Sequence, residues 1–167
     1  MINKFNLIFV TFFGIGKIKI LPGTFGSLVT TILLFCFFHI LFIPLNIILF
    51  VLVIIFLYSF YAINNYTKNL TNKDPKEVVI DEVIGQSIPL YLYEISHNTT
   101  KDFTDAIIFY FIIFLLFRFF DIIKPFPVSY FDKNFKNSFG VIFDDVFAGL
   151  YVVLTLIFYM MGKSYLF

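Results

Sequence analysis

Five carboxylates in this chain lie inside hydrophobic stretches. They occur in three short segments, VVIDEVIG, RFFDIIKPFP and VIFDDVFAG, and are Asp81, Glu82, Asp121, Asp144 and Asp145. A carboxylate at membrane depth is costly unless it is paired or bound to a cation, and clustered carboxylates repel one another. Mg²⁺ suits such a cluster because this hard ion takes carboxylate and water oxygens and often bridges to phosphate. The segments therefore predict a Mg²⁺ site formed by the five acids.

The alternative is that these acids are merely solvated among lipid headgroups, which would be sufficient for one acid but less so for two adjacent pairs. Zinc is not indicated, because His39 and His97 lie far from the acidic segments and Cys36 lies in an apolar run. Asp132, in the polar segment SYFDKN, is expected to form a solvated ion pair with Lys133.

Two cations accompany the central acidic segment. Arg118 and Asp121 are three residues apart and Lys124 follows three residues later, so on one helix the three side chains would share a face and form local ion pairs. The alternative is that the cations hold a dianionic phosphate. The spacing alone does not decide between these roles.

A glycine-containing turn, LPGTFGSL, precedes the first long apolar run. Gly23 permits a tight backbone, and Thr24 and Ser27 are candidate caps for the helix that follows. The free N–H groups at the start of that helix would form a natural phosphate site. Gly23 and Thr24 are therefore candidate substrate-binding residues, although the same pattern is typical of an ordinary turn and cap.

The composition indicates a membrane protein. Of the 167 residues, 60% are hydrophobic and 14% are charged, with a mean hydropathy of +0.93, whereas a soluble domain is about half apolar and about a quarter charged. The formal net charge of +1 does not indicate nucleic-acid binding. The length suits a single domain, residues 1–167. The first segment, MINKFNLIFVTFFGIGK, is expected to be interfacial or re-entrant and not a cleaved signal peptide.

Four hydrophobic runs, at about 28–43, 46–63, 106–123 and 141–161, are long enough to cross a bilayer as helices. A weaker segment at 83–93 contains Gly85 and Pro89 and is expected to be short, broken or re-entrant. The predicted fold is an all-α integral membrane bundle of four long helices and one short or broken helix. If the weak segment crosses, ten of the 12 basic residues share one face with all five acids, so we expect five crossings and a cytoplasmic site.

Four motifs together resemble one known family. LPGTFGS, DPKEVVIDEVIG, RFFDIIKPFPVSYFDKN and GVIFDDVFAG occur in the order and spacing of phosphatidylglycerophosphatase A proteins, over about residues 11 to 155. The resemblance implies a small enzyme integral to the bacterial cytoplasmic (inner) membrane, with its active site on the cytoplasmic face. It implies Mg²⁺-dependent hydrolysis of the terminal phosphate of phosphatidylglycerophosphate to phosphatidylglycerol, a step of phospholipid biosynthesis.

The resemblance also implies roles for individual residues. The acidic pattern of the family falls on the same five carboxylates, its basic position on Lys124, and its Pro-Gly-Thr turn on Pro22, Gly23 and Thr24. The expected catalytic set is Asp81, Glu82, Asp121, Lys124, Asp144 and Asp145, and the expected substrate-binding set is Gly23, Thr24, Arg118 and Lys124. One departure lies upstream of the turn, where the family often has Ser-Pro and this chain has Ile18-Lys19.

Three other classes fit less well. A histidine-based lipid phosphatase needs histidines in phosphate-binding motifs, which this chain lacks, and a CDP-alcohol phosphotransferase needs a D-G-x-x-A-R signature that is absent. A small divalent-cation transporter would place its carboxylates near the midplane of several spans. Here the acids are expected to gather at one end, so the enzyme is preferred to the transporter.

Overall fold

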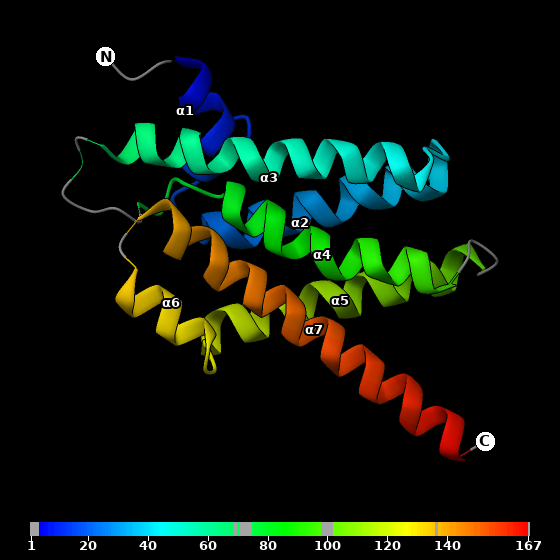
Figure 1. Cartoon of the computed structure of the whole chain (residues 1–167). Helices are drawn as coiled ribbons and strands as arrows, with labels where there is room; N and C mark the ends of the chain where they lie inside the picture. The colour runs from blue at the N-terminus through cyan, green and yellow to red at the C-terminus, as the bar shows by residue number, and fades with distance from the viewer. Residues whose placement is uncertain (1–3, 69, 71–74, 98–101, 136, 167) are drawn as a thin grey trace.

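The computed structural model describes residues 4–68, 70, 75–97, 102–135 and 137–166, and this part of the chain is 83% helix with no strand (Figure 1). A 3₁₀ turn, η1 (Ile15–Lys17), follows the first helix, and a π-helical turn, η2 (Cys36–Ile40), continues the second. The seven α-helices are α1 (Lys4–Val10), α2 (Pro22–Phe35), α3 (Leu45–Thr67), α4 (Ile80–His97), α5 (Phe103–Ile123), α6 (Val128–Asn134) and α7 (Ser138–Leu166). The all-α prediction is confirmed.

Five helices traverse the bundle in alternating directions. In Figure 1, α2, α4 and α7 begin at the end of the bundle where α3 and α5 finish. Four helices, namely α2 with η2, α3, α5 and α7, are long and apolar enough to cross a membrane, with stretches of 19, 23, 21 and 26 residues. They match the four predicted runs, and α4 is the fifth, weaker segment.

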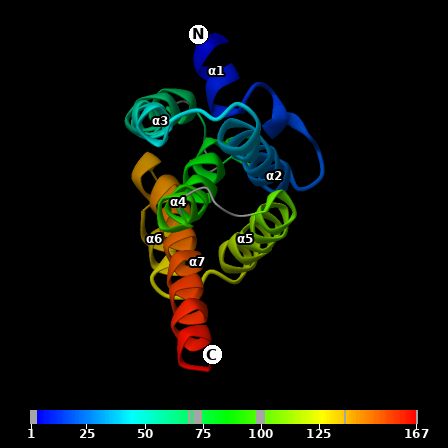
Figure 2. The same cartoon turned by 90° about the vertical axis from the view of Figure 1, so that its right-hand side faces the viewer.

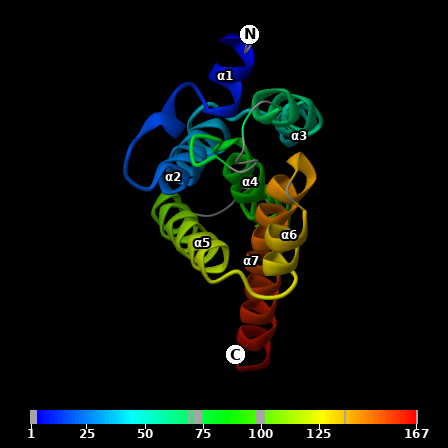
Figure 3. The same ribbon diagram turned by 90° about the vertical axis from the view of Figure 1, so that its left-hand side faces the viewer.

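The central helix of the bundle is α4. It is an uninterrupted helix of 18 residues that contains Pro89. Of the two forms expected from the sequence, a short helix or a broken helix, the structure therefore has the unbroken form. Viewed along the bundle, α4 lies between α2, α3, α5 and α7 (Figures 2 and 3). Glycines bring α4 and α7 together, because a Cβ added to Gly149 would lie 2.4 Å from the carbonyl oxygen of Gly85. The residues that begin α4 are therefore held rigidly against α7.

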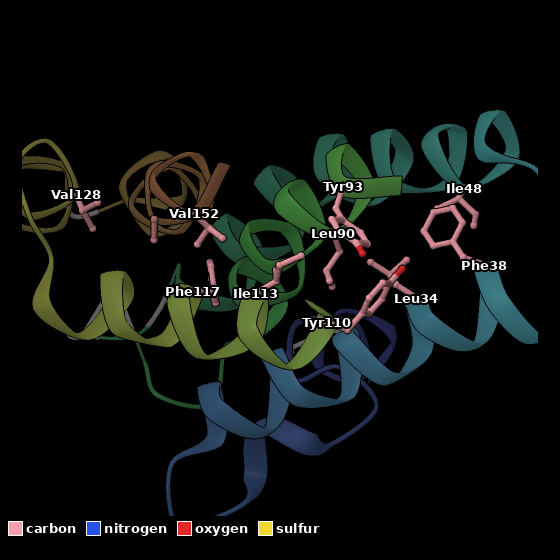
Figure 4. Packing of buried hydrophobic residues seen from close by; sticks show 11 residues of the cluster. Leu34, Phe38, Ile48, Leu90, Tyr93, Tyr110, Ile113, Phe117, Val128 and Val152 are labelled. Atoms are coloured by element: carbon pink, nitrogen blue, oxygen red, sulfur yellow. The ribbon is translucent and has the colours of Figure 1, made fainter. Parts of the chain in front are cut away.

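Apolar side chains fill the bundle between these helices (Figure 4). The main cluster consists of Leu34, Phe38, Ile48, Leu90, Tyr93, Tyr110, Ile113, Phe117, Val128, Ala148 and Val152. Large apolar side chains also cover the outside of the spans, for example Phe50, Ile54 and Leu57 on α3, which are 66%, 50% and 63% exposed. Apolar surface on this scale would be a liability in water but matches the interior of a bilayer.

The N-terminal segment packs against α3 and against the segment before α4. The hydroxyl of Tyr58 on α3 donates a 2.6 Å hydrogen bond to Oδ1 of Asn6 on α1. The backbone N–H of Val79 donates to the carbonyl oxygen of Val10 at 3.0 Å. A Cβ added to Gly16 would lie 1.9 Å from the carbonyl oxygen of Glu77, so the two segments are in direct backbone contact.

Candidate active site

The five carboxylates line a single cavity of about 310 Å³. They come from three helices: Asp81 and Glu82 from the first turn of α4, Asp121 from the last turn of α5, and Asp144 and Asp145 from the early part of α7. All three positions lie at the end of the bundle where α4 and α7 begin (Figure 1). The bundle therefore brings together side chains separated by more than 60 positions in the sequence.

Three of these acids form a candidate metal site. Asp81, Glu82 and Asp145 each offer one carboxylate oxygen, and the three oxygens lie within 4.8 Å of one another. Two ligands on opposite sides of one Mg²⁺ ion lie roughly 4.2 Å apart, so the trio is close to the spacing that an ion needs. Oε2 of Glu82 and Oδ1 of Asp145 are buried and have no hydrogen-bond partner among the described residues, which is costly unless a cation binds them. The residues present therefore fit a hard divalent ion.

The other two acids are bonded to cations. Asp121 Oδ2 lies 2.7 Å from Arg118 Nη1, which confirms the predicted local ion pair on α5. Arg118 Nη1 also donates to Ser27 Oγ on α2 at 3.4 Å. A Cβ added to Gly23 would lie 1.9 Å from Glu82 Oε1 and 3.5 Å from Arg118 Nη1. Glycine at this position thus allows the carboxylate and the guanidinium to approach the α2 backbone.

Lys124 differs from its predicted placement. It follows the end of α5 in a left-handed conformation, with φ 49°, so it leaves the helical face that carries Arg118 and Asp121. Its Nζ donates to Asp132 Oδ1 and to Asp144 Oδ2, both at 2.9 Å. The prediction of a shared face was wrong for Lys124, because the helix ends one residue before it.

The same contact corrects the prediction for Asp132, which bonds Lys124 and is not simply a solvated partner of its neighbour Lys133. Helix α6 makes this possible by folding back along α7, with Phe131 stacked on Phe143 and Phe147. Partial burial alone would lower the pKa of Lys124, but Asp144 and Asp132 outweigh it and raise the pKa above its ordinary value. The ammonium group therefore stays charged at neutral pH.

The turn before α2 also differs from its predicted form. Leu21 occupies the N-cap position without a side-chain cap, and Pro22 is the first helical residue. Ser27 does not cap the helix, because its hydroxyl donates to the carbonyl oxygen of Gly23 at 2.9 Å. Leu21, Pro22 and Gly23 line the cavity but Thr24 does not. The start of α2 thus forms part of the cavity wall.

Two further cations, which the sequence motifs did not indicate as site residues, also line the cavity. Lys19 lies in the segment before α2 and Lys76 in the segment before α4, and both side chains are exposed. Lys19 precedes the glycine-containing turn and Lys76 precedes the first acidic segment, and these positions could have indicated that both lie near the site. Among the described side chains, His39 does not line the cavity and its Nε2 lies 3.1 Å from Glu94 Oε1, while the side chain of His97 lies outside the described part of the chain.

Fold and site together define a class. The chain is an all-helical membrane protein whose polar cavity combines a candidate metal site with cations that suit a phosphate group. The sequence profile of the family "Phosphatidylglycerophosphatase A" matches residues 8–160. The chain therefore belongs to the phosphatidylglycerophosphatase A family, a family of phosphatases.

Individual relatives agree with this assignment. A phosphatidylglycerophosphatase A from Haemophilus influenzae is 36% identical over 154 residues, covering 92% of this chain and 87% of the relative. A phosphatidylglycerophosphatase A from Escherichia coli is 30% identical over 166 residues, covering 99% and 87%. A protein from Bacteroides thetaiotaomicron named a putative phosphatidylinositol-3-phosphatase is 36% identical over 145 residues, covering 84% of each chain. No solved structure matches the chain.

Proposed function

We propose that this protein hydrolyses the terminal phosphate of phosphatidylglycerophosphate to give phosphatidylglycerol and phosphate, with Mg²⁺, at the cytoplasmic face of a bacterial inner membrane. The observation that carries the proposal is the trio of buried Asp81, half-buried Glu82 and buried Asp145, which lies beside two cations at one end of a membrane bundle. Membership of the family supports the substrate. The end of the bundle suits a lipid headgroup, whose phosphate lies at the membrane surface while the acyl chains stay in the bilayer.

In this proposal the residues of the cavity have different roles. Asp81, Glu82 and Asp145 would hold Mg²⁺, which would supply Lewis acidity and offset the charge of the phosphate. Arg118 and Lys124 donate hydrogen bonds to phosphate oxygens and stabilise the charge that builds up on them. A carboxylate outside the trio, Asp121 or Asp144, accepts the proton of the attacking water. The water oxygen bonds to phosphorus as the bond between phosphorus and the glycerol oxygen breaks, and the leaving oxygen takes up the proton that the carboxylate accepted.

A second substrate deserves a direct comparison because one relative is named a putative phosphatidylinositol-3-phosphatase. Both lipids present a phosphomonoester on the headgroup of a phospholipid, so the same carboxylates and cations would serve either. The family profile favours phosphatidylglycerophosphate. Phosphate release from the two lipids, measured side by side, separates the two substrates.

The transporter alternative requires polar groups along a path through the bundle. The carboxylates of the cavity lie at one end, and the apolar cluster around Leu90, Ile113 and Phe117 fills the interior beyond them. Glu94, nearer the other end of α4, is satisfied locally by the hydroxyl of Tyr110 at 2.8 Å and by His39. Among the described residues, this arrangement favours a surface site over a conduction path.

The proposal is tested by phosphate release from purified protein in neutral detergent micelles. We expect rapid release from phosphatidylglycerophosphate and much slower release from phosphatidylinositol 3-phosphate, each measured as kcat/KM in the presence of Mg²⁺. A protein that releases phosphate only from the inositol lipid would replace the proposed substrate. A protein that releases phosphate from neither lipid would refute the proposed activity.

A further inference from the structure

Lys19 and Lys76 line the cavity but take no part in the proposed hydrolysis. Both side chains are exposed, whereas Asp81 and Asp145 are 6% and 3% exposed. Neither lysine makes an ion pair or side-chain hydrogen bond with the residues that the structure describes. An exposed cation on the wall of a ligand cavity is available to an anion that enters it.

The other two cations of the cavity are already engaged. Arg118 is paired with Asp121, and Lys124 is shared between Asp132 and Asp144. The cavity therefore has two layers of charge, a deep layer of carboxylates with their partners and a more exposed layer of ammonium groups that have no ion pair within the described part of the chain. Five carboxylates face four cations, so one bound divalent ion would make the cavity net positive. A cavity of that sign suits a ligand with more than one phosphate.

The backbone holds the two lysines on the same side. The segment that carries Lys19 packs against the segment that carries Lys76, with the Gly16 backbone in close contact with the carbonyl of Glu77. A hydrogen bond of 3.0 Å from the Val79 N–H to the Val10 carbonyl joins the same two parts of the chain. The two segments that bring Lys19 and Lys76 to the cavity, far apart in sequence, are therefore held together by backbone contacts.

We propose that Lys19 and Lys76 form a subsite for the phosphodiester of the lipid headgroup. This inference rests on the proposed function. The substrate has a terminal phosphomonoester, which the deep layer binds, and a phosphodiester one glycerol unit nearer the acyl chains. With the monoester among the buried groups, the diester lies towards the mouth, where the two ammonium groups are. The subsite would make the protein prefer a headgroup with two phosphates over a lipid phosphomonoester that has no diester.

The rival explanation is that the lysines attract the protein to anionic lipids in general. In that case, removing the two lysines would slow the hydrolysis of all anionic lipids equally, and any exposed lysine nearby would contribute to the attraction. Lys17 provides the matched control, because it ends η1 two residues before Lys19, is exposed, and does not line the cavity. Neutral detergent micelles remove most of the general attraction.

The experiment measures kcat/KM for phosphatidylglycerophosphate and for phosphatidic acid, which lacks the diester. In the Lys19→Gln, Lys76→Gln double variant, kcat/KM for phosphatidylglycerophosphate is expected to fall roughly tenfold, the effect of losing two partly exposed ion pairs. Its kcat/KM for phosphatidic acid should change by less than about twofold. Lys17→Gln should change neither value. The double Lys→Arg variant should retain the preference, because it keeps both charges. Glycerophosphoglycerol, a soluble diester without a monoester, should inhibit the wild-type protein and not the double Gln variant.

Each other outcome overturns the subsite. An equal fall in kcat/KM for both lipids would mean that the lysines attract anionic lipids in general or bind the monoester. Unchanged values on both lipids, or equal inhibition of both proteins by glycerophosphoglycerol, would show that the lysines do not bind the diester. A wild-type protein inactive on both lipids would refute the proposed function, and the subsite with it, whereas an active wild-type protein with an unchanged preference in the double variant refutes the subsite alone.

Discussion

Asp145→Asn is expected to remove most of the activity while leaving the fold intact. The side chain is 3% exposed, and its Oδ1 has no hydrogen-bond partner among the described residues. Asparagine keeps the shape but removes the charge, so the trio with Asp81 and Glu82 loses one of its three anionic ligands. A loss of roughly 3–4 kcal/mol of transition-state stabilisation is expected, which corresponds to about a 10²–10³-fold fall in kcat/KM.

Stability separates this effect from unfolding. Without metal, Asp145→Asn should melt at the same temperature as the wild-type protein or higher, because it removes one charge from a cluster of like charges. Mg²⁺ should raise the melting temperature of the wild-type protein, since an ion that binds only the folded state stabilises it by about 2.7 kcal/mol at 100 times its Kd. The variant should lose most of that increase.

Asp105→Asn is the matched control for this experiment. Asp105 is exposed in the first turn of α5, at the opposite end of the helix from Asp121. Its replacement should leave both the activity and the Mg²⁺-dependent rise in melting temperature unchanged. The reasoning fails if Asp145→Asn keeps near wild-type kcat/KM together with the full Mg²⁺ stabilisation, because the trio would then not be a metal site.

Three further predictions concern the supporting structure. Asp132→Asn should lower kcat/KM roughly tenfold at an unchanged melting temperature, because the lysine at the end of α5 loses one of its two carboxylate partners; wild-type activity would leave Asp132 without a positioning role. Gly23→Ala should lower kcat/KM and the melting temperature, because the new Cβ would lie 1.9 Å from Glu82 Oε1; an unchanged variant would mean that the two elements separate easily. With the native cysteine replaced by alanine, Asp102→Cys should react with an impermeant thiol reagent on intact cells and Lys133→Cys should not; the reverse pattern would mean that α4 does not cross and would contradict five crossings.

The fold was predictable from the sequence to a considerable extent. Four apolar runs and the weaker segment with Pro89 correspond to the five helices that traverse the bundle, because span length and hydropathy are local properties. The limits of the elements were less predictable. The second helix begins at Pro22, well before its apolar run, since proline suits the first helical position and the glycines after it are tolerated within the helix.

The acids of the site were also predictable, since buried charge in an apolar run is unusual wherever it occurs. Their partners were not. Lys124 pairs with Asp132 and Asp144 because the chain turns in a left-handed conformation after α5 and α6 folds back along α7, and neither event is encoded by spacing along one helix. Lys19 and Lys76 are brought to the cavity by backbone contacts between distant loops, which a single sequence does not reveal.

The most direct test of the account is the metal dependence of phosphate release from phosphatidylglycerophosphate. Purified protein in neutral micelles is treated with EDTA, freed of chelator, and assayed while Mg²⁺ is added back. The trio Asp81, Glu82 and Asp145 predicts that activity falls to background after EDTA and returns with Mg²⁺ along a saturating curve. Full activity in the EDTA-treated protein, independent of added Mg²⁺, would contradict the account.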